Sequence, residues 1–256
     1  MSPPRTPLWD TLWTHRAQSV SLATEVNGNL VNHLLAVTGV TGKRVLEVGC
    51  GTGADSVFFG MQGADAYCLD YSSRALTLVR ELAKSASVTA RCVQADAYRI
   101  PFADATFDVV FHQGFLEHFR DAGALIAEQV RVLKPGGIIL ADVPQRYSLF
   151  TVKKRYRMLR GRWYAGWERS FSIVQLERLF RKAGLVVADR YGYDYYPAIL
   201  GRLRRLGRSP RIGVLFRQRL GWYEAAWVRF ERTRAALYVY QNIGLVARKP
   251  REAEPR

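Results

Sequence analysis

Three glycines at alternate positions stand in the segment Glu47-Val-Gly-Cys-Gly-Thr-Gly53. Glycine adopts left-handed backbone conformations and lets backbone amides come close to a ligand, so Gly49, Gly51 and Gly53 predict a sharp turn that binds a small molecule. For Cys50 we expect its backbone, and not thiol chemistry, to matter in this turn. The alternative is a turn that serves only the packing of helix and strand. It is less common at the carboxyl end of a strand in an α/β sheet, where ligands usually bind.

An acidic residue, Asp70, stands 19 positions after Gly51 and precedes Tyr71. An ionised carboxylate only accepts hydrogen bonds, so it suits the two hydroxyl donors of a ribose diol. The spacing Gly49-x-Gly51-x-x-Ala54, with Asp70 beyond it, also satisfies the dinucleotide-binding fingerprint. The glycines and the acid alone therefore leave an NAD-dependent oxidoreductase open.

Further candidate site residues stand at the ends of the next predicted strands, namely Asp96 with Ala97, and then Gln113. His118 comes shortly afterwards, where it could deprotonate a hydroxyl or carbon acid, or cap the following helix. Asp96 could likewise be a turn former. The spacing of the four histidines and three cysteines fits no common ligand pattern, so we expect no metal and no disulfide framework.

These residues need elements to position them, and hydrophobic periodicity predicts alternating strands and helices. Strands are expected at 44–49, 65–72, 88–96, 107–113, 135–144, 185–193 and 236–250. Helices are expected at 54–61, 73–86, 122–133 and 172–184. Such alternation is typical of an α/β protein with a doubly wound, parallel sheet, whose ligands bind at the carboxyl ends of the strands.

The ordered runs VLEVGCGTG, CLDYS, QADAYRIPFADATFDVVFHQGFLEH and RVLKPGG resemble the class I S-adenosylmethionine-dependent methyltransferases. The similarity is closest to the small-molecule type that includes the ubiquinone and menaquinone biosynthesis methyltransferases. It implies a Rossmann-like seven-stranded sheet, with helices on both faces and a reversed last strand. It also implies S-adenosyl-L-methionine as the cofactor.

The resemblance further implies a set of cofactor contacts. The turn from Glu47 to Gly53 would surround the methionine part, and Asp70, beside Tyr71, would accept both ribose hydroxyls. The Asp96 carboxylate and the Ala97 backbone N–H would bind the adenine. Gln113 would lie beside the sulfonium. His118 is the candidate general base, although methyl transfer can also proceed by positioning alone.

The net charge of +16 is concentrated in one part of the chain. Residues 145–219 hold 19 basic and 4 acidic residues, whereas residues 1–144 hold 12 and 14. We expect an N-terminal helical cap over 1–40, with Trp9 and Trp13 closing the cofactor pocket. The methyltransferase core would span 41–193 and 236–250, with basic insertions at 145–170 and 194–235 that form a cationic, aromatic lid.

Arginines that alternate with large apolar residues favour an acidic or amphiphilic small molecule as substrate, including a lipid-linked one. RNA is the second expected partner, and a non-catalytic polyanion- or lipid-binding module on the same fold is the remaining alternative. The first residues do not fit a signal peptide, and no window is apolar enough to span a membrane. We therefore expect a cytoplasmic enzyme, with peripheral contact at the inner face of the membrane.

Overall fold

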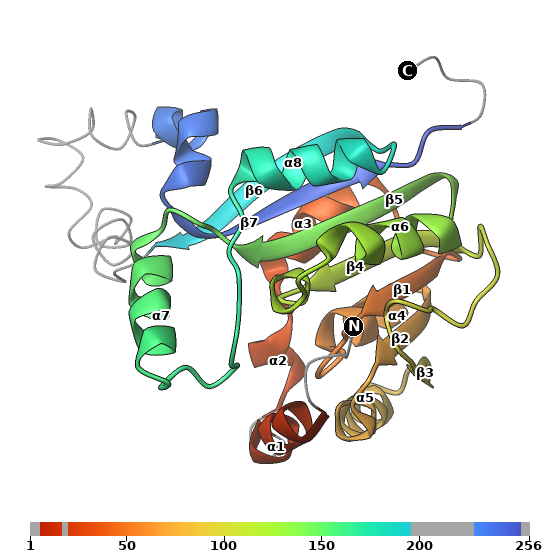
Figure 1. Ribbon diagram of the computed structural model, residues 1–256. Helices are drawn as coiled ribbons and strands as arrows, with labels where there is room; N and C mark the ends of the chain where they lie inside the picture. The colour runs from red at the N-terminus through yellow and green to blue at the C-terminus, as the bar shows by residue number, and fades with distance from the viewer. Residues whose placement is uncertain (1–5, 17–19, 196–227, 252–256) are drawn as a thin grey trace, which may run out of the picture.

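Seven strands form one sheet in the order β3-β2-β1-β4-β5-β7-β6 in a computed structural model that describes residues 6–16, 20–195 and 228–251 (Figure 1). All neighbouring strands are parallel except β7, which is antiparallel to both β5 and β6. The strands are β1 Arg44–Val48, β2 Asp65–Asp70, β3 Ala90–Gln94, β4 Phe107–Gln113, β5 Leu133–Pro144, β6 Val186–Tyr195 and β7 Tyr240–Arg248. The expected α/β fold with a reversed last strand is confirmed.

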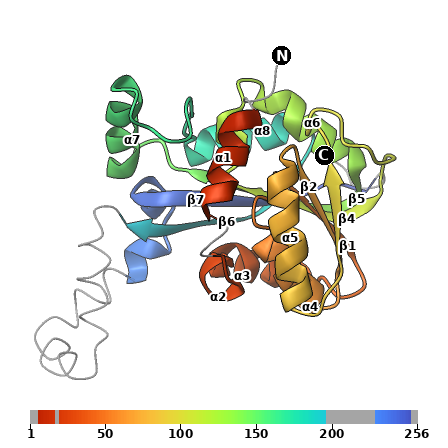
Figure 2. The same ribbon diagram turned by 90° about the horizontal axis from the view of Figure 1, so that it is seen from below.

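Helices cover both faces of the sheet (Figure 2). One face carries α3 Gly28–Val37, α4 Ala54–Met61 and α5 Ser73–Ser85, and the other carries α6 Ala122–Val132 and α8 Ile173–Lys182. The remaining elements are α1 Thr6–Arg16, α2 Leu22–Glu25, α7 Leu149–Leu159 and the short 3-10 helices η2 Leu116–His118 and η3 Arg234–Tyr238. None of the helices in the described residues is both long and apolar enough to cross a membrane.

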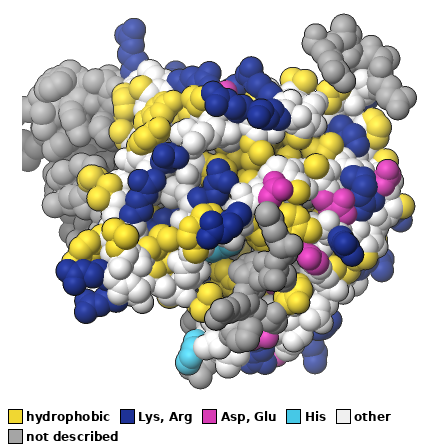
Figure 3. Space-filling view, viewed as in Figure 1, with side chains coloured by type: hydrophobic (Ala, Val, Ile, Leu, Met, Phe, Trp, Pro, Cys, Tyr) yellow, Lys and Arg dark blue, Asp and Glu magenta, His cyan; other side chains and the backbone are white. Residues whose placement is uncertain are grey.

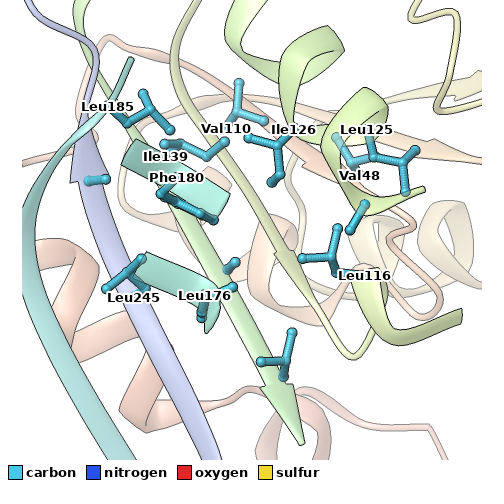
Figure 4. Packing of buried hydrophobic residues seen from close by; sticks show 14 of the residues in the cluster. Val48, Val110, Leu116, Leu125, Ile126, Ile139, Leu176, Phe180, Leu185 and Leu245 are labelled. Atoms are coloured by element: carbon cyan, nitrogen blue, oxygen red, sulfur yellow. The ribbon is translucent and has the colours of Figure 1, made fainter. Parts of the chain in front are cut away.

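The two cores follow from the alternation of side chains along each strand. In β4, Val109 packs on the α3 side, whereas Val110 packs on the side of α6 and α8. Leu176 and Phe180 lie one helical turn apart in α8, and both are fully buried in that second core (Figure 4). Strands that are covered on both faces in this way read in the sequence as continuous apolar runs.

The strand order positions the site. From β1 the chain winds outward to β2 and β3, and then crosses back so that β4 pairs with the other edge of β1. Connections therefore leave β1 and β4 in opposite directions, which opens a crevice at the carboxyl ends of these two strands. The glycine turn follows β1 and η2 follows β4, so both lie at this crevice.

Several predicted boundaries were wrong. β3 is shorter than 88–96, and β5 begins at Leu133, because Leu133 pairs with Phe107 before a register shift in which the Pro-Gly-Gly segment is accommodated. The last strand begins at Tyr240, since residues 234–238 form η3. The basic insertion expected over 194–235 falls largely outside the described residues.

Replacing Phe180 by Ala should lower the free energy of unfolding by about 3–5 kcal/mol, because a fully buried aromatic ring is lost and a cavity remains. Urea denaturation followed by circular dichroism measures this change. Val174→Ala is the matched control on the same helix, because this side chain is 41% exposed, and it should leave stability nearly unchanged. Equal effects of the two substitutions would contradict the placement of α8.

Candidate functional site

The turn after β1 requires glycine for conformation and for space. Gly49 and Gly51 have φ angles of 67° and 52°, which L side chains rarely adopt. A Cβ on Gly49 would lie 2.1 Å from the Phe115 ring, and one on Gly51 would lie 2.6 Å from the Trp13 ring. The backbone of the turn is therefore in direct contact with two aromatic side chains from distant segments.

A cavity of about 690 Å³ opens where the turn meets the ends of β2 and β4. It is large enough for a nucleoside cofactor and a second small molecule together. All of the site residues expected from the sequence line it except Gly53: Glu47, Gly49, Cys50, Gly51, Asp70, Tyr71, Asp96, Ala97, Gln113 and His118. Gly53 instead is the N-cap residue that precedes α4, where a Cβ would lie 2.7 Å from Val79.

Asp70 is tied by one backbone hydrogen bond to the glycine turn and by another to the start of α5. Its Oδ2 accepts from the Gly51 N–H at 2.9 Å, and its Oδ1 accepts from the Ser72 N–H at 2.9 Å. Burial raises the pKa of Asp70, and these hydrogen bonds oppose that shift. A carboxylate oxygen can accept two hydrogen bonds, so each retains capacity for one hydroxyl in the cavity.

The other expected cofactor residues surround this carboxylate. Asp96 accepts a hydrogen bond from the Tyr98 backbone N–H at 2.9 Å and also lines the cavity, so it both forms the turn and faces the cavity. Glu47 accepts from the Ser56 hydroxyl at 2.6 Å, and burial raises its pKa well above the usual value. Gln113 is exposed at the end of β4.

Helix α1 forms one wall of the cavity, through Trp9, Leu12 and Trp13. Figure 2 shows this helix between α5 and α7. A hydrogen bond between the Asp10 and Ser72 side chains fixes α1 to the start of α5, and Trp9 packs edge-on against His118 with ring centroids 4.7 Å apart. The same helix thus contacts the cofactor turn and the candidate base.

A buried polar cluster borders the other half of the cavity, which Glu117, His118 and Glu168 line. The Lys154 ammonium is 2.9 Å from Glu168 Oε2, and the two side chains are only 1% and 6% exposed. The other oxygen of Glu168, Oε1, lies 3.9 Å from His118 Nδ1. Glu117 precedes His118 in η2 and lines the same cavity.

Burial shifts the pKa of both η2 residues toward their neutral forms. It raises the pKa of Glu117 to about 8, and it lowers the pKa of His118 to about 4. Glu117 Oε2 and His118 Nδ1 have no hydrogen-bond partner among the described residues. At neutral pH the cavity therefore presents a protonated carboxyl group and an uncharged imidazole, and each has an unsatisfied polar atom.

Aromatic side chains enclose this polar cluster. Phe119 comes from the segment after η2, and Phe150, Trp163 and Tyr164 come from residues 145–170. The buried Trp163 Nε1 has no partner within the described part of the chain, although indole N–H groups that are buried are usually satisfied. The arrangement suits a flat ring that offers a hydrogen-bond acceptor.

Sequence reasoning missed Glu117, Lys154 and Glu168 as site residues. Glu117 could have been found from its position beside His118, but nothing distinguishes Lys154 from the other cations in its basic run. The remaining histidines lie away from the cavity. His15 is exposed, His33 binds Asp189 at 2.6 Å, and His112 is fully buried within β4.

Comparison with known proteins agrees with this geometry. Residues 46–141 match a family described as "Methyltransferase domain". A ubiquinone biosynthesis O-methyltransferase from Thiobacillus denitrificans is 31% identical over 187 residues, which cover 70% of this chain and 79% of the relative.

Solved structures share the fold at low sequence identity. The magnesium protoporphyrin IX methyltransferase of Synechocystis PCC 6803, solved with bound SAH, has a TM-score of 0.61, is 14% identical and covers 93% of each chain. The cyclase SpnF has a TM-score of 0.65, is 21% identical and covers 98% of each chain. These two neighbours show the fold alone, since one is named for methyl transfer and the other for cyclisation.

The chain belongs to the class I S-adenosylmethionine-dependent methyltransferase family. It is a methyltransferase, and S-adenosylmethionine is its cofactor. The family assignment decides against the dinucleotide-dependent oxidoreductase and the non-catalytic module. The residues at the crevice fit the cofactor, because Asp70 retains acceptor capacity and the glycine turn lines the cavity beside it. No cluster of three potential metal ligands occurs among the residues described.

Asp70→Asn should weaken binding of S-adenosylhomocysteine by roughly 10- to 100-fold, because a charged acceptor contributes about 1.5–3 kcal/mol to a hydrogen bond. Isothermal titration calorimetry measures the affinity. Asp65→Asn is the control at the opposite end of β2, where the carboxylate binds Arg91 instead of lining the cavity. Equal affinity of the two folded variants would exclude the ribose role.

Glu117→Gln should flatten the pH dependence of stability. The folded pKa of about 8 lies above the ordinary 4.5, so folding takes up a proton between these values, and stability falls as the pH rises. The wild type should lose up to about 1.4 kcal/mol per pH unit more than the variant between pH 5 and 8.

Urea denaturation across this pH range measures the difference between Glu117→Gln and the wild type. Glu81→Gln, on the exposed side of α5, is the control and should follow the wild type. Parallel profiles for the wild type and Glu117→Gln would mean that Glu117 is ionised in the folded protein.

Proposed function

We propose that the enzyme transfers a methyl group to an oxygen atom on the ring of an amphiphilic small molecule. The observation that carries this proposal is the second half of the cavity, where aromatic side chains enclose Glu117 and His118. The names of the curated relatives, ubiquinone biosynthesis O-methyltransferases, support it, since such a substrate combines a polar ring with a lipid tail. RNA is less well suited, because the acceptor would have to enter past α1 and the aromatic wall.

The proposed division of labour follows the two halves of the cavity. The turn from Glu47 to Gly53 holds the methionine part of the cofactor, and Asp70 holds its ribose beside Tyr71. Asp96 and Ala97 bind the adenine, and Gln113 lies nearest the reacting centre. The core at 41–193 and 236–250 carries these residues, while the cap at 1–40 and the insertion at 145–170 enclose them. The second proposed insertion spans 194–235.

The cofactor supplies a methyl group that is already activated on a sulfonium. The protein must therefore position the acceptor and remove the proton of its hydroxyl group. His118 is neutral at pH 7 and can take the proton from an acceptor hydroxyl. The negative charge of Glu168, 3.9 Å from Nδ1, stabilises the imidazolium that forms. Glu117 keeps its proton at neutral pH and can donate a hydrogen bond to a neighbouring oxygen of the acceptor.

The Lys154–Glu168 ion pair has a positioning role in this scheme. Neither side chain has access to bulk water, so each depends on the other for compensation of its charge. The pair joins α7 to Glu168 within the 145–170 segment, and it holds the Glu168 carboxylate beside His118. An amphiphilic acceptor resides in a membrane, and we propose that the enzyme works at a membrane surface.

His118→Ala should reduce methyl transfer by roughly 10²- to 10⁴-fold, the usual contribution of a general base, with unchanged affinity for S-adenosylhomocysteine. Activity is measured with a radiolabelled methyl donor on a panel of hydroxylated aromatic acceptors with and without apolar tails. His15→Ala is the control, because this residue is exposed on α1. Normal turnover by a folded His118→Ala variant would remove the base role, and failure of every acceptor in the panel would overturn the proposed substrate class.

A further inference from the structure

Helix α7 exposes an unusual amount of apolar side chain. Leu149, Val152, Tyr156 and Leu159 are 57%, 61%, 58% and 87% exposed, and they recur at the spacing of a single helical face. Tyr147, just before the helix, is 59% exposed. Large apolar side chains that are exposed one at a time are ordinary, but a continuous stripe marks an interaction surface.

Positive charge borders this stripe on both sides. On a helical projection, Arg157 and Arg160 lie along one edge and Arg155 along the other. The segment from 145 to 167 contains seven Lys and Arg residues and no Asp or Glu. Figure 3 shows hydrophobic and basic side chains intermixed at the left of the molecule, whereas the acidic side chains of this face gather at the right.

The opposite face of α7 is fixed to the protein. Thr151 is 1% exposed, and its hydroxyl donates to the Gln145 backbone carbonyl at 2.6 Å. Lys154, on the same side, forms the buried ion pair with Glu168. The helix therefore has a preset orientation that leaves its apolar stripe outward, so the exposure is not the result of a loosely attached helix.

We infer that α7 docks the enzyme on an anionic lipid bilayer. A helix with an apolar face bordered by Lys and Arg, and with aromatic residues at its boundary, lies in the plane of a membrane interface. The arginines match the negative head groups, and the apolar stripe enters the acyl boundary. The purpose of this docking rests on the proposed amphiphilic acceptor, although the docking itself does not require substrate.

The docked orientation would bring the cavity to the membrane. Phe150 belongs to α7 and lines the cavity, and Trp163, Tyr164 and Ala165 follow on the same segment. One short segment thus carries both the bilayer face and the acceptor wall. An acceptor with a lipid tail could pass between them without its tail crossing bulk water.

Vesicle sedimentation tests the docking, with the full chain and two kinds of vesicle, phosphatidylcholine alone and phosphatidylcholine mixed with phosphatidylglycerol. Binding should require the anionic lipid and should weaken from about 0.1 M to about 1 M salt, because the Debye length shortens from about 10 Å to about 3 Å. Replacement of Arg155, Arg157 and Arg160 by Gln should weaken binding roughly 100-fold and flatten the salt dependence.

The apolar stripe is tested separately. Replacing Val152 and Leu159 by Gln should weaken vesicle binding at least about 10-fold, because two apolar side chains no longer enter the acyl boundary. The loss should be the same at every salt concentration, because these substitutions change no charge. The matched control for charge is the triple substitution of Arg80, Lys84 and Lys182 by Gln, since all three lie exposed on α5 and α8. This control should bind vesicles nearly as well as the wild type.

Two further readouts separate the docking from the proposed function. All α7 variants should keep wild-type affinity for S-adenosylhomocysteine and wild-type turnover of a tailless, soluble acceptor. If the wild type methylates the acceptors but does not bind vesicles, the docking alone is overturned. If it binds vesicles but methylates no amphiphile, the proposed substrate is overturned. The wild type could instead form dimers and fail to bind vesicles. If replacing Val152 and Leu159 by Gln dissociated those dimers, the stripe would be the contact surface for a second copy of the chain.

Discussion

The pair of backbone hydrogen bonds accepted by Asp70 is the constraint on which the site depends. The bond from Gly51 fixes the glycine turn against the end of β2, and the bond from Ser72 fixes the start of α5. The Gly49 N–H donates to the Leu69 carbonyl at 2.7 Å and closes the same junction. Because the carboxylate is already held by backbone groups, it can bind a ribose diol without losing further conformational freedom.

Segments outside the central sheet complete the cavity. Helix α1 lies over the turn through Trp13, and the 145–170 segment supplies the aromatic wall and the buried Lys154–Glu168 pair. Their packing removes water from Glu117 and His118, which is why both residues favour their neutral forms. The neutral forms of Glu117 and His118 are thus produced by segments that lie outside the central sheet.

The two sides of the 145–170 segment differ in chemical character. Its inner side carries the buried Lys154–Glu168 ion pair, whereas its outer side carries an apolar stripe bordered by arginines. In the proposed scheme this asymmetry links membrane binding to access of an amphiphilic acceptor. It also gives a physical reason for the uneven charge of the chain, since a near-neutral core can bind its cofactor while the attached segment is drawn to an anionic surface.

The sequence by itself determined the α/β fold, the reversed last strand and the cofactor class, and all of the site residues expected from it except Gly53 line the cavity. These signals are local, because glycine spacing, strand-end acids and apolar periodicity each act within a few residues. Only the tertiary structure decided that Glu117, Glu168 and Lys154 form one buried cluster, and that Gly53 packs on Val79 instead of facing the cavity. Burial and charge pairing depend on contacts between segments distant in the chain, and no spacing in the sequence encodes the desolvation that shifts a pKa.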